Sequence, residues 1–279
     1  MIDEAELKPL QENILFVAKI FDKFCLDNNL DYFLLGGTAL GALRHQGFIP
    51  WDDDFDVCMK FDDYEKFLRL WSENSDPRLY LQRENTNEWP LFFSKLRLNG
   101  SVYMEPEDYG RDMHNGIYID IMCLNNTFNN KFLRYTQYLA AKTLSAGAVG
   151  RRGYLVDSRL KKLISKLCAV VVIGPIKNML LFYVRVLNSP GHQTTLLSHF
   201  FGRAKFKNTS FYSSYLLPVR KVRFEGYLFK VMNQVEAYLA QRFGETYMDL
   251  PSPEVRAQYP SHCVEYVLSD NVDFEDIGG

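Results

Sequence analysis

Two aspartates separated by one apolar residue occupy a segment that reads as a β-strand. Asp54 and Asp56 alternate with Phe55 and Val57. Residues two apart in an extended chain point to the same face, so both carboxylates are predicted to share one face while the apolar pair enters the core. Carboxylates placed in this way can bind one or two divalent cations, which lie about 3.5–4 Å apart in two-metal sites.

A pair of glycines precedes these acids in the sequence. Gly36 and Gly37 follow residues 31–35, a short apolar run predicted to form a buried strand, and they open a predicted short helix. The first N–H groups of a helix lack partners within the helix and attract anions. The pattern therefore suggests a metal site beside a phosphate site.

Two motif-based alternatives for this segment can be excluded. A calcium-hand loop needs Gly at its sixth position and Glu at its twelfth; counted from Asp52, these positions hold Val57 and Asp63. A P-loop needs Gly-Lys followed by Ser or Thr, whereas Gly41 is followed by Ala42. A solvated acidic loop remains the simplest alternative, since most charge runs are solvated.

Further charged residues lie within two later predicted strands. Asp120 stands in the middle of the apolar strand 117–122, where burying a carboxylate is costly unless it is paired or bound to metal. Lys95 and Arg97 share one face of the strand 91–98. Asp120 could be a satisfied core or edge carboxylate, and the two cations could be solvated.

The order of these residues matches the signature of the nucleotidyltransferase superfamily, and residues 36–56 closely resemble the LicD family of phosphocholine transferases. The fukutin-related sugar phosphotransferases are similar to that family. Shorter LicD-like segments lie at residues 93–97, 116–121 and 224–226, and looser ones lie at residues 238–251 and at His262. The resemblance implies a mixed α/β (α+β) fold with a nucleotidyltransferase-like core sheet flanked by helices.

By the same resemblance, the protein is expected to transfer phosphocholine from CDP-choline, a CDP-linked alcohol, to a hydroxyl of a glycan or glycolipid acceptor, releasing CMP. Mg²⁺, or Mn²⁺, would be held by Asp54, Asp56 and Asp120, with Asp120 also a candidate proton acceptor. Mg²⁺ prefers a few carboxylates together with phosphate and water oxygens. The expected substrate-binding residues are Gly36, Gly37, Thr38, Arg44, His45, Asp52, Lys95, Arg97 and His262.

Several functions remain open from the sequence. A nucleotidyltransferase using CTP or another nucleoside triphosphate would need the same acids, and a non-catalytic glycan-binding relative could retain them. The donor could instead carry ribitol, glycerol or ethanolamine. A choline head would need aromatic faces, because a quaternary ammonium cannot donate a hydrogen bond. The aromatic residues near the motifs are Trp51, Trp89, Tyr109 and Tyr118.

Composition narrows the class of protein. The chain has 279 residues, 47% hydrophobic and 24% charged, which is typical of a globular protein. Its net charge of −2 argues against nucleic acid as a partner. The five cysteines are scattered and include no Cys-x-x-Cys pair, and the start of the chain lacks a signal-peptide pattern. Both features favour a cytoplasmic location. The expected location also includes a peripheral position at the inner face of the membrane.

The chain is predicted to divide into a catalytic core over residues 1–125, a helical insertion over 126–205 and a C-terminal segment, 206–279, that returns to the core in one compact unit. Residues 105–116 are polar and glycine-punctuated, as in a mobile loop or substrate lid. The insertion has a basic start and an uncharged run at 167–176. That run predicts either a buried helical hairpin or peripheral docking of residues 151–187 on an anionic membrane.

Overall fold

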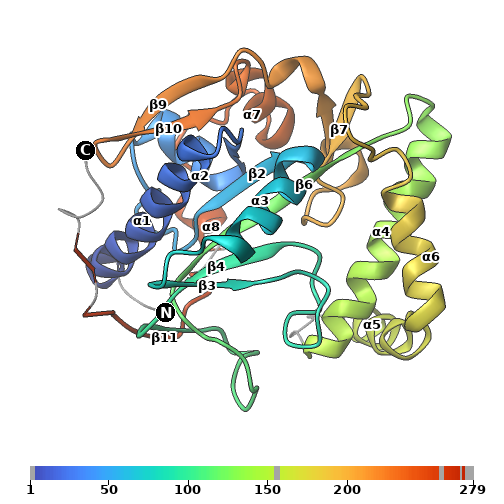
Figure 1. The fold of residues 1–279 in the computed structure, drawn as a ribbon, viewed down its shortest axis with the longest axis horizontal. Helices are drawn as coiled ribbons and strands as arrows, with labels where there is room; N and C mark the ends of the chain where they lie inside the picture. Colours follow the sequence, from blue (N-terminus) through green and yellow to red (C-terminus); the bar gives the residue numbers. More distant parts are fainter. Residues whose placement is uncertain (1–3, 154–157, 258–260, 271, 274–279) are drawn as a thin grey trace.

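A mixed sheet forms the centre of the protein. The computed structural model describes residues 4–153, 158–257, 261–270 and 272–273. The sheet order is β1-β2-β6-β4-β3, extended by β7, which pairs with β6, and by β8, which pairs with β7. Two further pairs, β9 with β10 and β5 with β11, lie outside it (Figure 1). The strands are β1 (Phe33–Leu34), β2 (Asp56–Lys60), β3 (Leu79–Gln82), β4 (Ser94–Leu98), β5 (Val102–Met104), β6 (Tyr118–Asn126), β7 (Leu196–Ser198), β8 (Ser210–Tyr212), β9 (Arg220–Phe224), β10 (Tyr227–Val231) and β11 (Glu265–Val267).

Helices flank this sheet, so the predicted α+β class is confirmed. The long helix α1 and helix α3 pack against the central strand β6. α3 buries one apolar stripe, formed by Tyr64, Phe67, Leu68 and Trp71. The helices are α1 (Glu4–Asp27), α2 (Gly36–Arg44), α3 (Phe61–Glu73), α4 (Lys131–Arg152), α5 (Arg159–Val171), α6 (Gly174–Val184), α7 (Val235–Phe243) and α8 (Pro253–Arg256).

The acid-bearing strand is shorter than the sequence suggested. β2 begins at Asp56, where its pairing with β6 begins, and Asp54 lies two residues before it. The alternation nevertheless extends upstream of the strand. Phe55 and Val57 are fully buried, while Asp54 and Asp56 are partly exposed. The predicted division of apolar and acidic side chains between two faces is therefore confirmed.

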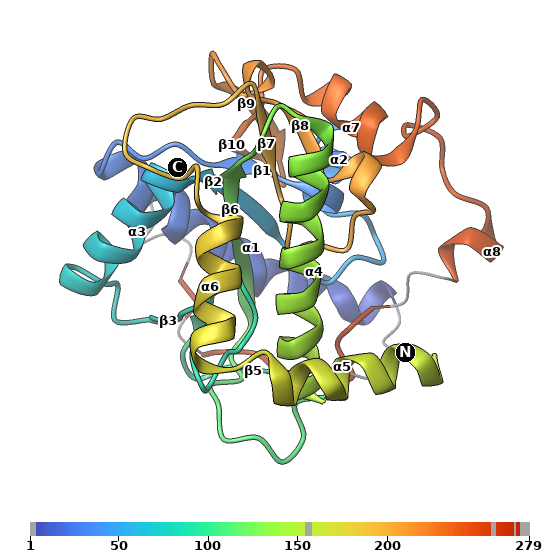
Figure 2. The same cartoon turned by 90° about the vertical axis from the view of Figure 1, so that its right-hand side faces the viewer.

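Three helices of the insertion, α4, α5 and α6, lie beside the sheet (Figures 1 and 2). They enclose a small apolar cluster of their own, to which Trp89, Leu91 and Phe92 of the core contribute. The interpretation of this region as a buried hairpin is wrong for α5, where Ser165 is the one buried residue. The chain rejoins the sheet at β7, which pairs with the end of β6.

A hairpin from the C-terminal segment holds the turn that precedes the acids. β9 and β10 are joined by Glu225 and Gly226, whose φ values of 48° and 78° fit a two-residue hairpin turn. Glu225 accepts a hydrogen bond from the Phe48 N–H at 3.2 Å, and it forms an ion pair with Lys8 at 2.9 Å. Phe224 packs edge-on against Phe48 and Phe55, with ring centroids 4.8 and 5.2 Å away.

Truncating Phe224 tests this link between the hairpin and the acid-bearing segment. Because Phe224 is fully buried, Phe224→Ala is expected to lower the free energy of unfolding by about 3–5 kcal/mol. The matched control is Leu228→Ala in the same hairpin, where Leu228 is 48% exposed; its cost should stay within about 0.5 kcal/mol. Urea denaturation measures both, and equal effects would contradict the packing described here.

Candidate functional site

Strand register brings the predicted charged residues into one row. β2 and β6 are parallel, with Asp56 opposite Asp120, and β6 and β4 are antiparallel, with Asp120 opposite Lys95. Adjacent strands lie about 4.8 Å apart. Asp56, Asp120 and Lys95 are therefore neighbours across three strands, and Asp54 lies one alternation upstream of Asp56.

The carboxylates of this row repel one another. Burial and the charges of Asp54 and Asp120 raise the pKa of Asp56 well above its usual range. The pKa of Asp54 rises to about 6, mainly because of burial, with Asp53 and Asp120 adding to the rise and His262 opposing it. The pKa of Asp52 is raised well above its usual value, mainly by burial and secondly by the charge of Asp54. A cation placed among these groups would relieve the repulsion.

Lys95 supplies one positive charge to the acids. Its side chain is buried, and its ammonium lies 2.8 Å from Asp120 Oδ1 and 3.1 Å from the centre of the Tyr118 ring. Burial lowers the pKa of Lys95 to about 8. This short ion pair partly offsets the negative charge of the row, and Lys95 also opposes the rise in the pKa of Asp56.

The three acids fit a divalent metal in chemical type. Hard cations such as Mg²⁺ take oxygen ligands, and Asp54, Asp56 and Asp120 offer them from adjacent segments. Within the described part of the chain, no group of three or more His, Cys, Asp or Glu side chains is placed so that it could hold a metal ion in this conformation. Lys95 engages Asp120 directly, so metal binding would require the Asp120 carboxylate to turn from the ammonium.

The diglycine bend lies directly against the acids. A Cβ atom on Gly37 would come within 2.9 Å of Asp52 Oδ2, and one on Gly36 would lie 3.5 Å from Asp56 Oδ2. Gly36 also has a φ of +56°, which side chains disfavour. The Thr38 hydroxyl accepts a hydrogen bond from the Asp56 N–H at 2.8 Å. The start of α2 and the start of β2 are therefore joined at the site.

The other predicted binding residues are distributed around this centre. Arg44 donates to the backbone carbonyls of Tyr247 and Asp249, which joins α2 to the C-terminal segment, and it also donates to His45 Nε2 at 3.0 Å. Arg97 is buried and donates to Gln82 Oε1 and the Gly116 carbonyl, each at 2.8 Å. Arg97 is thus held by the protein itself.

The C-terminal segment carries His262 to the acids through Asp53. Asp53 is 1% exposed, and its Oδ2 atom accepts hydrogen bonds from the Tyr103 hydroxyl at 2.9 Å and the Cys263 N–H at 2.7 Å. His262 Nδ1 lies 3.4 Å from Asp53 Oδ1, and this contact raises the pKa of His262. Sequence reasoning missed Asp53, although its place on the apolar face of the strand was a signal, because a buried acid needs partners.

A second missed residue is Arg203, an exposed cation near the acids. Its guanidinium lies 3.2 Å from His262 Nε2, and its charge opposes the rise in the pKa of Asp56. Arg203 follows the helical insertion in the chain, and no motif marks it. Its position depends entirely on how the chain returns to the sheet.

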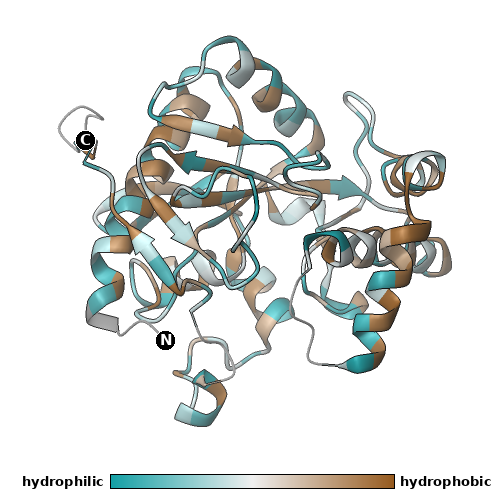
Figure 3. Ribbon diagram, turned by 90° about the horizontal axis from the view of Figure 1, so that it is seen from below, coloured by the Kyte–Doolittle hydropathy of each residue, from teal (hydrophilic) through white to brown (hydrophobic). Residues whose placement is uncertain are grey.

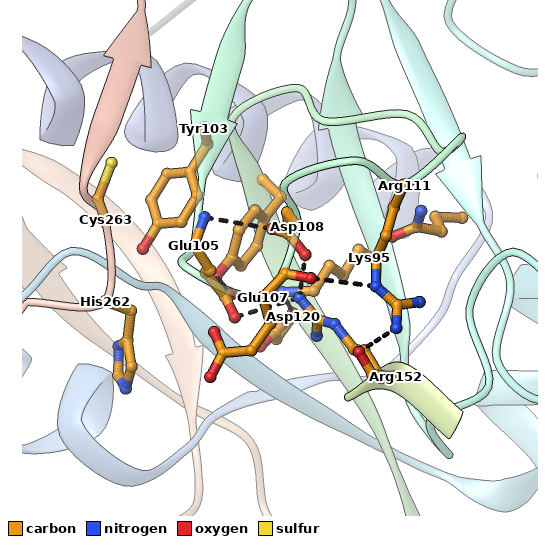
Figure 4. Close-up of polar contacts among 12 residues, drawn as sticks. Lys95, Tyr103, Glu105, Glu107, Asp108, Arg111, Asp120, Arg152, His262 and Cys263 are labelled. Carbon is orange, nitrogen blue, oxygen red and sulfur yellow. Dashed lines mark hydrogen bonds and ion pairs between the residues drawn. The ribbon is translucent and has the colours of Figure 1, made fainter. Parts of the chain in front are cut away.

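Residues 105–116, expected to be a mobile lid, are fixed at one end by a buried cation. Arg152, at the end of α4, is 1% exposed and lies 3.1 Å from Glu105 Oε2 and 2.6 Å from Asp108 Oδ1 (Figure 4). Although burial opposes ionisation, Lys95 and Arg152 lower the pKa of Glu105 to about 2. The Tyr118 hydroxyl donates to Glu105 Oε1 at 3.1 Å, which connects this ion cluster to Lys95 and Asp120.

The aromatic residues considered for a choline head are partly occupied by the protein's own cations. Trp89 is fully buried and has Arg152 4.3 Å and Lys95 5.0 Å from its ring centre. Tyr118 carries Lys95 over its ring. Trp51 has Arg256 at 4.3 Å, and Tyr109 is 58% exposed.

Comparison with known proteins agrees with this geometry. Residues 29–138, which include the diglycine bend and all three strands of the charged row, match the family model described as LicD/FKTN/FKRP, nucleotidyltransferase domain. The chain is 26% identical to the lipopolysaccharide cholinephosphotransferase LicD of Haemophilus influenzae over 268 residues, covering 93% of this chain and 98% of that protein. The predicted resemblance to the LicD family is therefore confirmed.

Other relatives match shorter parts of this chain. The mannosyltransferase regulator 4 of Saccharomyces cerevisiae is 30% identical over 122 residues, which is 42% of this chain and 10% of that protein. An uncharacterised protein of Rickettsia prowazekii is 53% identical over 36 residues, 13% of this chain and 14% of that protein. The likeness to the Haemophilus protein, by contrast, extends over the insertion and the C-terminal return.

Replacing Glu105 tests the buried ion cluster through its pH dependence. The pKa of Glu105 falls from 4.5 to about 2 on folding, so its stabilisation is complete above pH 4.5 and is lost as the pH falls toward 2. The difference in unfolding free energy between wild type and Glu105→Gln should shrink by about 2 kcal/mol from pH 7 to pH 3. Urea denaturation at the two pH values measures it.

The control for this experiment is Glu73→Gln, which changes an exposed carboxylate at the end of α3. It should change stability by no more than about 0.5 kcal/mol at either pH. A pH-independent difference for Glu105→Gln would contradict the ion cluster.

Proposed function

We propose that this LicD-family chain is a metal-dependent phosphotransferase that moves phosphocholine from CDP-choline to a hydroxyl of a cell-surface glycan and releases CMP. The observation that carries the proposal is the row formed by Asp56, Asp120 and Lys95 beside the diglycine bend. The Haemophilus relative, whose name assigns it cholinephosphate transfer to lipopolysaccharide, supports the choice of head group and acceptor class.

The reaction exchanges one phosphorus–oxygen bond for another. The acceptor oxygen bonds to the phosphorus that carries choline, the bond from that phosphorus to the oxygen of CMP breaks, and the hydroxyl proton passes to a carboxylate of the site, for which Asp120 is the candidate. Bound Mg²⁺ or Mn²⁺, held by Asp54, Asp56 and Asp120, would neutralise charge on the diphosphate. The protein's own contribution is mainly positioning and electrostatic stabilisation.

The residues around the row have distinct roles in this proposal. The first N–H groups of α2, at Gly37 and Thr38, form the anion-binding end of that helix. Lys95 is buried among the acids and would hold Asp120 in place before the donor arrives. Arg203 is exposed and close to His262, so we assign it to the donor diphosphate, where Arg can pair with phosphate oxygens through two N–H groups.

Neutralising single acids tests the metal mechanism. Asp56→Asn and Asp120→Asn should each lower CMP release from CDP-choline on the order of 10²–10³-fold or more. Because Asp56 is destabilised by its acidic neighbours, Asp56→Asn should melt at a higher temperature than wild type without metal. Added Mg²⁺ should stabilise the wild type through binding and stabilise the variant much less.

The control for this series is Asp27→Asn on the exposed end of α1, which should change neither transfer nor the response to Mg²⁺. Wild-type transfer by both Asp56→Asn and Asp120→Asn would reject the mechanism. Pyrophosphate release from CTP, in place of CMP release from CDP-choline, would instead identify a nucleotidyltransferase. CDP-ribitol, CDP-glycerol and CDP-ethanolamine, tested in parallel, identify the head group.

Replacing Arg203 tests the assignment of the donor site. Arg203→Met should raise the KM for the CDP-linked donor about tenfold, the loss of roughly 1.5 kcal/mol expected for one charged hydrogen bond. Lys205→Met is the matched control, because Lys205 is an exposed cation two residues away. Steady-state kinetics with varied donor concentration separates the two variants, and an unchanged KM for Arg203→Met would contradict the assignment.

A further inference from the structure

Helix α5 presents a large apolar surface that nothing in the described structure covers. Leu163 is 65% exposed, Leu167 62% and Val170 71%. The exposed apolar side chains of α5 are Leu160, Leu163, Ile164, Leu167, Val170 and Val171. The surface continues past the bend into α6, through Ile173, Ile176, Met179 and Phe182. Monomeric proteins rarely leave so many large apolar side chains exposed together without a use.

Close packing between small residues explains why α5 buries so little. α5 contacts α4 through Ser165, and a Cβ atom on Gly150 of α4 would come within 2.2 Å of the Ser165 carbonyl oxygen. A Cβ atom on Gly147 would likewise lie 3.2 Å from the Cys168 carbonyl oxygen. The backbones of the two helices therefore meet along a narrow line, and the large side chains of α5 remain outside the contact.

The exposed residues of α5 are sorted by charge around the helix. With 3.6 residues per turn, Leu163, Leu167 and Val170 lie opposite the buried Ser165. Basic residues, all exposed, flank this apolar face on both edges: Arg159, Lys162 and Lys166 on one edge, and Lys161 on the other. The chain contains no Asp or Glu between Ser158 and Pro190. Lysines in such positions extend their ammonium groups away from an apolar layer.

We infer that this face of α5, continued by the start of α6, docks on the surface of an anionic lipid bilayer. An apolar face bordered by Lys and Arg is the pattern of a helix that lies in the membrane interface, with its apolar side chains among the acyl chains and its cations at anionic headgroups. Figure 2 shows α5 lying across the ends of α4 and α6, and Figure 3 shows hydrophobic residues along these helices.

Two other occupants of this face fit the observations less well. A second copy of the chain would bring the basic edges of two α5 helices together, where like charges repel. No single helix among the described residues is long and apolar enough to cross a membrane, and α5 with α6 meets that test only as a pair bent by 106°. A bent, basic helix pair suits a membrane surface better than a membrane span.

The position of α5 in the chain connects its apolar surface to the site. Membrane docking of α5 does not depend on the proposed function. α5 follows α4, whose last residue, Arg152, binds Glu105 and Asp108 beside the charged row. Docking would therefore fix the orientation of the site toward the bilayer. Lipid binding is measurable without donor or acceptor, so its failure and the failure of the transferase proposal are distinguishable.

Co-sedimentation of the full chain with lipid vesicles tests the inference. The wild type should bind vesicles of phosphatidylcholine mixed with phosphatidylglycerol far more tightly than vesicles of phosphatidylcholine alone, and high salt should weaken the binding. The variant Lys161→Gln/Lys162→Gln/Lys166→Gln should bind the anionic vesicles on the order of 100-fold more weakly, since each basic residue near the surface contributes about 1 kcal/mol. Leu163→Asp/Leu167→Asp should lose binding at any salt concentration.

The control variant is Leu228→Asp, which places a charge at an exposed leucine on β10, away from the insertion. It should bind anionic vesicles as the wild type does. Circular dichroism and thermal melting check that all variants fold. Failure of the wild type to bind anionic vesicles, or equal binding by the Leu163→Asp/Leu167→Asp variant, would overturn the inference. So would a dimer, detected by light scattering, that this double variant abolishes.

Discussion

Mutual repulsion among partly buried carboxylates is the constraint around which this protein is built. The parallel pairing of β2 and β6 sets Asp56 beside Asp120, and the bend before β2 adds Asp52 and Asp54. Such a group is unfavourable without cations. The fold places Lys95 within it and Arg203 at its edge. In the proposed function, a divalent metal would supply the remaining positive charge at this edge of the sheet, where the donor diphosphate would bind.

The surrounding structure keeps these charges in place through contacts from distant parts of the chain. The hairpin of β9 and β10 holds the turn before the acids through Glu225 and Phe224. The C-terminal segment reaches the site through Asp53, which fixes Cys263 and His262. α7 contributes Tyr238, whose hydroxyl accepts a hydrogen bond from Gly36 N–H at 3.2 Å. Because residues from all these segments meet at one place, the catalytic geometry depends on the complete fold.

The helical insertion connects the site to the outside of the molecule. Its inner end supplies Arg152 to a buried cluster with Glu105 and Asp108, and Arg152 also lies over the Trp89 ring. Its outer end carries the apolar and basic face of α5. Because a buried cation costs desolvation energy unless carboxylates surround it, Arg152 depends on Glu105 and Asp108. The apolar side chains of α5, by contrast, are exposed.

The sequence by itself determined the α+β class, the alternation around Asp54 and Asp56, and the resemblance to the LicD family. These features follow from local periodicity and from an ordered motif, both of which are contained within short stretches of chain. Only the tertiary structure decided that Arg97 is held internally, that Arg152 fixes residues 105–116, that Asp53 and Arg203 accompany His262, and that α5 is exposed. Each of those outcomes depends on a partner far away in the sequence. Glu105 and Arg152, for example, are paired by the packing of α4 beside the sheet, and no local pattern in either segment indicates that pairing.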